Sequence, residues 1–210
     1  MDFDALAAFA AAMFTILNPI GNTALFAGMV SDVSTIERRA IVAKFTLAVA
    51  IILIVTLWIG EQVLGFFGVS IPSLEVAGGL VIGVIGMSML HGKQSAVHAD
   101  TSRKENQVTA DSIAVVPLAM PIVAGPGAIA TVIVNTHLYQ GIESNIKMSI
   151  VCLAMSAIVG LCFLAVGPIV RILGTSGLSI VTKFMGLILL AIAVGMFASG
   201  VQGLFPGLGG

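Results

Sequence analysis

The chain has 210 residues, of which 58% are hydrophobic and 9% are charged, and its formal net charge is −1. A soluble domain carries about 25% charged residues to keep its surface wetted, so this composition excludes a water-soluble globule. The near-neutral charge also gives no sign of nucleic-acid binding. The composition predicts an integral membrane protein.

Six segments are apolar enough to cross a bilayer as helices, which takes about 20 residues each. They cover roughly 5–30, 41–66, 74–91, 113–136, 147–172 and 181–203. A polar stretch separates the third from the fourth, so the chain divides into a first three-helix repeat at 1–91, a polar linker at 92–112 and a second repeat at 113–210. The predicted fold is an all-α integral membrane protein with six transmembrane helices.

The basic residues predict the orientation of these helices. Lys147 alone falls on one face, and the other eight Lys and Arg residues fall on the opposite face, namely Arg38, Arg39, Lys44, Lys93, Arg103, Lys104, Arg171 and Lys183. The positive-inside rule makes the face with eight basic residues cytoplasmic. We therefore expect a multi-pass protein of the inner membrane, with a cytoplasmic linker and both termini in the periplasm.

The two halves match when the chain is shifted by 107 residues. Pro19 then falls on Pro126, Gly79 on Gly186, and Met89 on Met196. Because each half has an odd number of spans, the second half enters the membrane from the opposite side, and the repeat is inverted. Inverted repeats are common among secondary transporters that work by alternating access. The alternative is an old duplication without mechanistic meaning.

The first span of each half contains proline and glycine near its middle. These segments are Asn18-Pro19-Ile20-Gly21-Asn22-Thr23 and Ala124-Gly125-Pro126-Gly127-Ala128. Proline inside a helix costs about 3 kcal/mol or more and leaves backbone groups unpaired. Within a membrane such groups are tolerated where protein or a water-filled cavity satisfies them. We therefore predict that helices 1 and 4 are broken near the midplane around a binding site; the alternative is a pair of kinks that serve only packing.

A helix that restarts after a break presents free N–H groups and the positive end of its dipole, which suits a carboxylate. In the first break we assign backbone donors to Gly21, Asn22 and Thr23, with an amide from Asn18. In the second, Gly127 and Ala128 donate, and Gly125 lets the ligand approach closely. The candidate substrate-binding residues are thus Asn18, Pro19, Gly21, Asn22, Thr23, Gly125, Pro126, Gly127 and Ala128. This small, uncharged site suits a small zwitterion.

Titratable residues within the spans are few. Glu75 is the candidate for carrying a coupling proton, because an acid inside a membrane segment is a functional candidate by default. Its alternative is an interfacial position without a role. No spacing among the histidines His91, His98 and His137 predicts a metal site, and no catalytic or nucleotide motif is present. We predict no enzyme activity and no cofactor.

The same breaks also carry a resemblance to a known family. Asn18-Pro19-Ile20-Gly21-Asn22, and Val116-Pro117-Leu118-Ala119-Met120-Pro121 leading into Ala124-Gly125-Pro126-Gly127-Ala128-Ile129, resemble the two signatures of the MarC family. Phe184-Met185-Gly186-Leu187-Ile188-Leu189 and Phe205-Pro206-Gly207-Leu208 are similar as well, so the resemblance covers nearly the whole chain. It implies a six-span transporter of small neutral amino acids such as glycine, alanine, serine or threonine, coupled to the proton gradient. It also implies that the broken-helix residues line the amino acid site.

Three functions remain open at this level. The first is a secondary transporter that binds its amino acid at the breaks and works within the lipid bilayer. The second is a small-solute channel or an exporter of other metabolites with the same architecture. The third is an accessory membrane protein with no substrate of its own. The sequence leaves open the direction of transport, the exact substrate, the coupling ion and the oligomeric state.

Overall fold

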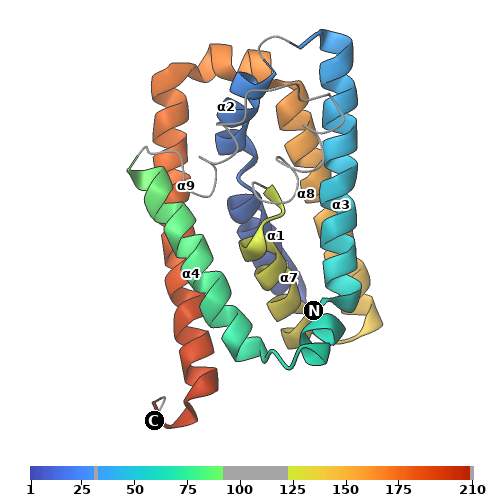
Figure 1. Cartoon of the computed structure of the whole chain (residues 1–210), viewed down its shortest axis with the longest axis vertical. Coiled ribbons are helices and arrows are strands. Elements are labelled where there is room, and N and C mark those ends of the chain that lie inside the picture. The colour runs from blue at the N-terminus through green and yellow to red at the C-terminus, as the bar shows by residue number, and fades with distance from the viewer. Residues whose placement is uncertain (31–32, 92–122, 209–210) are drawn as a thin grey trace.

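The computed structural model describes residues 1–30, 33–91 and 123–208 (Figure 1). Every regular element in these residues is helical, which confirms the all-α prediction. The elements are α1 (Phe3–Leu17), α2 (Pro19–Met29), α3 (Thr35–Phe66), α4 (Ile71–Leu90), α7 (Pro126–Leu138), α8 (Ile142–Leu164), α9 (Val166–Leu204) and the short 3-10 turn η2 (Pro206–Leu208).

Five helical stretches in the described part are long and apolar enough to cross a membrane. They are Phe3–Thr23, Thr35–Phe66, Ile71–Leu90, Ile142–Leu164 and Ser176–Leu204. They match the predicted first, second, third, fifth and sixth spans. The linker at 92–112 and the beginning of the fourth span, 113–122, lie outside the described residues, and α7 is the remainder of that span. The crossing by the fourth predicted span, and with it the total of six, therefore stays a prediction.

The predicted fifth span ends too late in the chain. It was placed at roughly 147–172, whereas α8 ends at Leu164 and the next helix begins at Val166. Residues 166–173 continue the apolar pattern but run across the upper end of the molecule in Figure 1. The direction changes at Gly174, whose φ of 61° lies in the left-handed region that glycine adopts without a Cβ clash. Hydropathy could not locate the end of α8 because the residues on both sides of Ala165 are apolar.

The second and first halves are held together by two aromatic contacts. The ring of Phe26 in α2 stacks on that of Phe163 in α8, with centroids 4.4 Å apart and an interplanar angle of 6°. Phe45 of α3 packs on the other side of Phe163 at 4.9 Å. All three are fully buried, so Phe163 of α8 joins α2 and α3 through its ring. The outer faces of α3 and α8 carry exposed large apolar residues, as a surface in contact with lipid requires, including Leu47, Ile51, Val55, Leu153 and Leu161.

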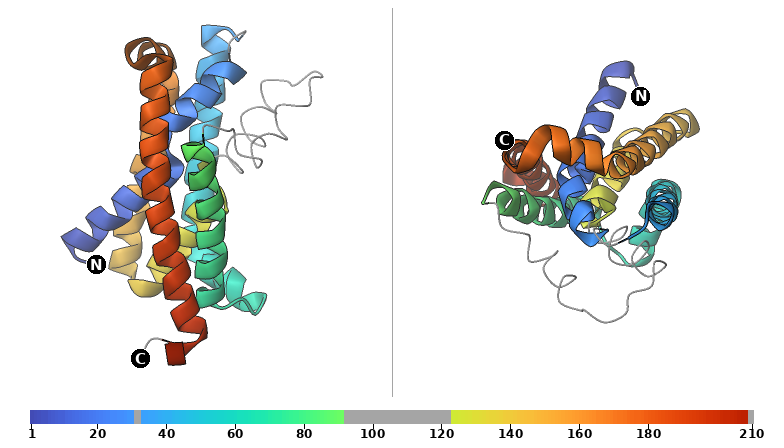
Figure 2. Two further views of the ribbon diagram at one scale, coloured as in Figure 1. Left: turned by 90° about the vertical axis from the view of Figure 1, so that its left-hand side faces the viewer. Right: turned by 90° about the horizontal axis from the view of Figure 1, so that it is seen from above.

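Helices α4 and α9 pack closely and run in opposite directions (Figures 1 and 2). A Cβ added at Gly79 would lie 2.8 Å from the carbonyl oxygen of Ala193, and one at Gly186 would lie 2.9 Å from that of Gly86. A shift of 107 residues converts the first contact into the second, because Gly79 becomes Gly186 and Gly86 becomes Ala193. The contacts thus have the reciprocal pattern that an inverted repeat predicts.

We expect Gly79→Ala to destabilise this helix pair. The new methyl group would overlap backbone atoms of α9, and overpacking of this kind typically costs about 1–3 kcal/mol. Gly83→Ala is the matched control, because its Cβ would lie 3.6 Å from Ala193 Cβ, an ordinary contact. Thermal unfolding in detergent should show a lower Tm than that of the wild type for Gly79→Ala, and no decrease in Tm for Gly83→Ala. Equal stability of the two variants would contradict the packing described here.

Both termini lie toward the same end of the long axis (Figure 1). The amino group of Met1 donates to Ser144 Oγ at 3.2 Å, and Lys147 Nζ donates to the Met1 carbonyl at 3.1 Å. These bonds fix the N-terminus to the first turns of α8. Two termini at one end agree with an even number of crossings, and the side of the membrane on which they lie stays a prediction.

Candidate functional site

The first predicted break is present at Asn18, between α1 and α2. Asn18 has φ 44° and ψ 59°, and it is the only non-glycine residue with positive φ in the described part of the chain. Asparagine tolerates this left-handed conformation better than most residues do. Pro19, the first residue of α2, has no N–H to donate to the carbonyl of Thr15 four residues before it. The Asn-Pro pair therefore interrupts the helix locally.

The side chains around this break bond to its own backbone. Asn18 Oδ1 accepts from the Gly21 N–H at 3.2 Å. Asn22 Nδ2 donates to the Leu17 carbonyl at 2.9 Å, and Thr23 Oγ1 donates to that of Pro19 at 2.8 Å. The Asn22 N–H also bonds to the Asn18 carbonyl at 3.0 Å. In this conformation the donors predicted at Gly21 and Asn22 thus have intramolecular partners.

The side-chain amide of Asn18 has a weaker partner. Its Nδ2 donates to the sulfur of Met89 in α4 at 3.8 Å, and a thioether is a weak acceptor. The repeat-related Met196 of α9 is in a similar position, because Thr131 Oγ1 of α7 donates to its sulfur at 3.8 Å. Among the predicted polar groups of the first break, the Asn18 Nδ2–H is therefore the one most easily redirected to a ligand.

The second predicted break coincides with the start of α7. Gly125 is its N-cap and Pro126 its first residue, and no side-chain hydrogen bond caps this end. Gly127 and Ala128 are buried, whereas Pro126 is exposed. The segment before it, with Pro117 and Pro121, lies outside the described residues. Its N-cap glycine has no side chain, so among the described residues no N-cap side chain takes the first N–H groups of α7.

The fold brings the two breaks together in the middle of the molecule (Figure 1). A Cβ at Gly127 would lie 3.9 Å from Ile16 Cγ2 in the last turn of α1 and 2.5 Å from Ile82 Cγ1 in α4. Leu17 and Ala128 belong to one buried apolar cluster. The C-terminal end of α1 therefore lies against the N-terminal end of α7.

This arrangement has a defined electrostatic character. The C-terminal end of a helix carries a partial negative charge of about 0.5 and the N-terminal end an equal positive one. Here the two ends come from different helices and lie side by side, and the nine predicted binding residues carry no formal charge. A molecule with an ammonium group and a carboxylate a few ångströms apart is complementary to such a pair of ends.

Glu75 lies on the same helix face as the residues that touch α7, but not at the breaks. It is 9% exposed, and Ser199 Oγ of α9 donates to its two carboxylate oxygens at 3.2 and 3.3 Å. Gly78 and Ile82 follow on that face at helical spacing and pack on α7. Seven residues of helix put Glu75 about 10 Å from Ile82 along α4.

Sequence reasoning missed the contribution of α4 to the site. Ile82 and Met89 contact the second and first breaks respectively, and neither was a predicted site residue. The one available signal was Met89, which matches Met196 in the repeat. Among the described residues, no three His, Cys, Asp or Glu side chains lie close enough to hold a metal ion.

Comparisons with known proteins agree on one family. The family model for MarC family integral membrane proteins matches residues 3–205. The chain is 36% identical over 208 residues to the membrane protein YhcE of Escherichia coli, covering 99% of this chain and 96% of the relative. It is 32% identical over 199 residues to the inner membrane protein MarC of Salmonella arizonae, covering 90% of each. No solved structure matches the chain.

Proposed function

Because the chain belongs to the MarC family of integral membrane proteins, we propose that it is a secondary transporter of small neutral amino acids of the glycine, alanine, serine and threonine class. One observation supports this above all. The end of α1 and the start of α7 meet in the middle of a membrane-spanning bundle, where helix ends of opposite polarity lie side by side. Half-helix ends of this kind bind the charged groups of substrates in other secondary transporters.

In the proposed complex the substrate carboxylate accepts hydrogen bonds from the N–H groups of Gly127 and Ala128. The Asn18 amide gives up its contact with Met89 and adds a third donor. The ammonium group lies at the carbonyl end of α1, where the Thr15 carbonyl receives no N–H from Pro19. The small residues around the site, among them Gly125, leave room for a short substrate side chain.

Transport by this route requires the halves to move. In the present conformation Gly127 lies against Ile82, so the ligand site is closed on the side of α4. Alternating access through rocking of two inverted three-helix repeats would separate these residues on one side at a time. The reciprocal glycine contacts between α4 and α9 support such repeats, with these two helices at their interface.

Coupling to protons is assigned to Glu75. It is the buried carboxylate of α4 and lies on the face that leads, through Gly78 and Ile82, to the second break. Protonation would weaken its hold on the Ser199 hydroxyl and so alter the contact between α4 and α9. This gives the proton a physical way to bias the movement of the two halves.

Reconstituted protein in liposomes tests the proposal. We expect counterflow of labelled alanine against unlabelled alanine, and net accumulation when a pH gradient is imposed. Glu75→Gln should keep counterflow and lose the gradient-driven accumulation, because it retains the shape of the side chain without a titrating group. Glu143→Gln, which changes an exposed carboxylate on α8, should keep both counterflow and gradient-driven accumulation.

The alternatives give different results. A channel would allow labelled alanine to equilibrate without counterflow, and an accessory protein would move none of the amino acids. If Glu75→Gln accumulates alanine at the wild-type rate under a pH gradient, the coupling proton is carried elsewhere. If only larger or charged metabolites are moved, the proposed substrate class is wrong.

A further inference from the structure

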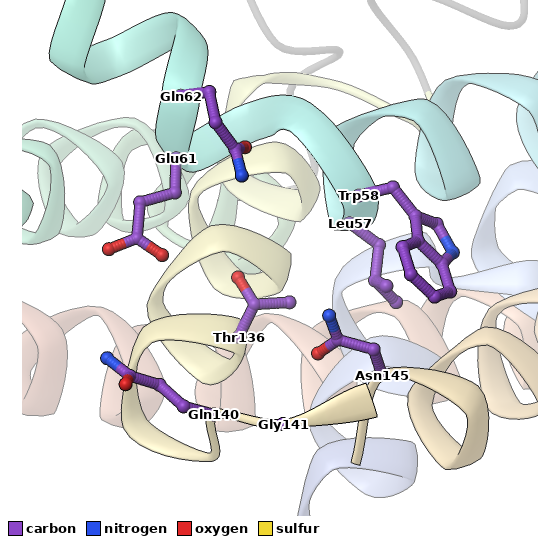
Figure 3. A pocket seen from close by; sticks show the side chains of 8 residues that line it. All are labelled: Leu57, Trp58, Glu61, Gln62, Thr136, Gln140, Gly141 and Asn145. Carbon is purple, nitrogen blue, oxygen red and sulfur yellow. The ribbon is translucent and has the colours of Figure 1, made fainter. Parts of the chain in front are cut away.

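A polar cavity lies away from the two breaks, at the end of the molecule where the N-terminus is fixed (Figure 3). Its volume is about 190 Å³, and it lies between the C-terminal ends of α3 and α7 and the start of α8. We call it the α3–α7–α8 pocket. Its polar lining includes Trp58, Glu61, Gln62, Thr136, Gln140 and Asn145. None of these belongs to the candidate site described above.

Two neutral oxygen atoms in this pocket lack a donor. Asn145 Oδ1 is buried and has no hydrogen-bond partner in the described part of the protein. Thr136 Oγ1 gives its proton to the Ile133 carbonyl at 2.8 Å, so its lone pairs remain for another donor. An unsatisfied buried acceptor costs about 1–3 kcal/mol, which a ligand carrying N–H groups would recover once rotation of the Asn145 amide brings Oδ1 to the pocket surface.

A carboxylate, that of Glu61, accompanies these acceptors. His137 Nδ1 lies 2.8 Å from Glu61 Oε1, a contact that leaves Oε2 for a ligand. Trp58 also lines the pocket, and its ring is held in place because Nε1 donates to Ser149 Oγ at 3.2 Å. An indole face attracts cations. A carboxylate, neutral oxygen acceptors and an indole ring together favour an ammonium group.

The pocket also contains groups that can bind an anion. Gln62 and Gln140 carry amide N–H groups, and Gly141, which also lines the pocket, is the N-cap of α8 without a side-chain cap. The pocket therefore offers acceptors and donors to one small molecule. Its volume equals that of about six water molecules at about 30 Å³ each, which is enough for a small amino acid.

We propose that the α3–α7–α8 pocket binds the ammonium group of a small amino acid before the molecule reaches the breaks; the identity of the ligand as a transported substrate rests on the function proposed above. Helix α7 connects the two places, with its C-terminal end at the pocket and its N-terminal end at Gly127. Its 13 residues span about 20 Å, which is more than half of a hydrocarbon core of about 30 Å. The pocket is thus a first binding site at the mouth of the route.

The protein carries its own reporter for this site, because Trp58 is its single tryptophan. Purified protein is titrated with three compounds: alanine, 2-aminoethanol and propionate. Of the two charged groups of an amino acid, 2-aminoethanol has the ammonium group alone and propionate the carboxylate alone. Alanine and 2-aminoethanol should change the Trp58 emission saturably, and propionate at equal concentration should not. Glu61→Gln should raise Kd for 2-aminoethanol by about tenfold or more, the usual effect of losing a charge-assisted hydrogen bond. Asn145→Ala should also raise it.

Glu143→Gln is the matched control, since it neutralises an exposed carboxylate near the pocket that pairs with Lys147. It should change Kd by no more than about twofold, as surface substitutions do. A response of equal size to sodium chloride would identify an inorganic cation site and overturn the proposal. So would a Glu61→Gln variant that binds 2-aminoethanol as tightly as the wild type.

The outcome also separates this inference from the transporter proposal. If Trp58 responds with the expected dependence on Glu61 but liposomes transport no amino acid, the ammonium pocket stands and the transporter proposal fails. If liposomes transport alanine but Trp58 does not respond, the pocket fails and the transporter proposal stands. Asn18→Ala should leave the Trp58 response unchanged, because Asn18 lies at the breaks and not in the pocket.

Discussion

Gly127→Ala should lower amino acid transport by at least about tenfold, because the added methyl group enters the place where the start of α7 meets α4 and the proposed ligand. The Cβ would lie 2.5 Å from Ile82 Cγ1, a distance that real Cβ atoms do not show. Ile82 is 1% exposed and has little room to move. Counterflow of labelled alanine in liposomes measures the loss.

The double variant Gly127→Ala with Ile82→Ala separates two reasons for that loss. Removing the outer carbons of Ile82 makes room for the new methyl group, so the thermal stability lost in the single variant should return. Transport should not return if the ligand carboxylate needs close access to the Gly127 N–H. Full recovery of transport would show instead that Gly127 serves only to pack α7 on α4, and the site assignment would be wrong there.

Gly195→Ala is the control for the substitution itself. Gly195 is in the long part of α9, and a Cβ there would have no atom within 4 Å. Alanine is favoured over glycine in a helix by about 1 kcal/mol, so this variant should be at least as stable as the wild type. Its transport rate should be unchanged.

The break at Asn18 and the helix start at Pro126 were predictable from the sequence because their causes are local. An Asn-Pro pair within an apolar run removes a helix hydrogen bond wherever it occurs, and the structure interrupts the helix at Asn18 as predicted. The restart at Pro126 follows from the same chemistry. Five of the six predicted membrane helices were likewise found, where apolar segments in the described residues are long. Local composition determined these features, so a single sequence was sufficient.

The partners of the broken helices were not predictable in the same way. Ile82 lies against Gly127 because α4 crosses α7 at that place, and no pattern within either helix specifies this contact. The cap at Asn18 is a different case: its side chain accepts from the Gly21 N–H, a bond that its N-cap position favours. The prediction gave that N–H to a ligand, so two local preferences competed for one donor. In the structure the N-cap bond to Asn18 Oδ1 takes this donor.

Substitutions of Asn18 should have the second large effect on transport. Three replacements separate its role in capping α2 from its proposed role as an amide donor to the substrate. Asn18→Gly keeps the left-handed backbone and removes the amide. Asn18→Ala loses both, and should lower the free energy of unfolding by about 2–3 kcal/mol from the left-handed strain and the lost cap. Asn18→Asp keeps the cap oxygen but places a negative charge where the proposed carboxylate lies.

If the Asn18 amide donates to the substrate carboxylate, transport should fall by about tenfold to a hundredfold in Asn18→Gly, which is the effect of one hydrogen bond to a charged group. Asn18→Asp should be still less active than Asn18→Gly, because two carboxylates repel each other. The KM for alanine and the Tm in detergent are measured together for each variant. Activity that follows stability, with Asn18→Asp as active as the wild type, would limit Asn18 to capping α2. If instead every variant without the Asn18 amide N–H loses transport whatever its Tm, the Asn18 amide contacts the amino acid directly.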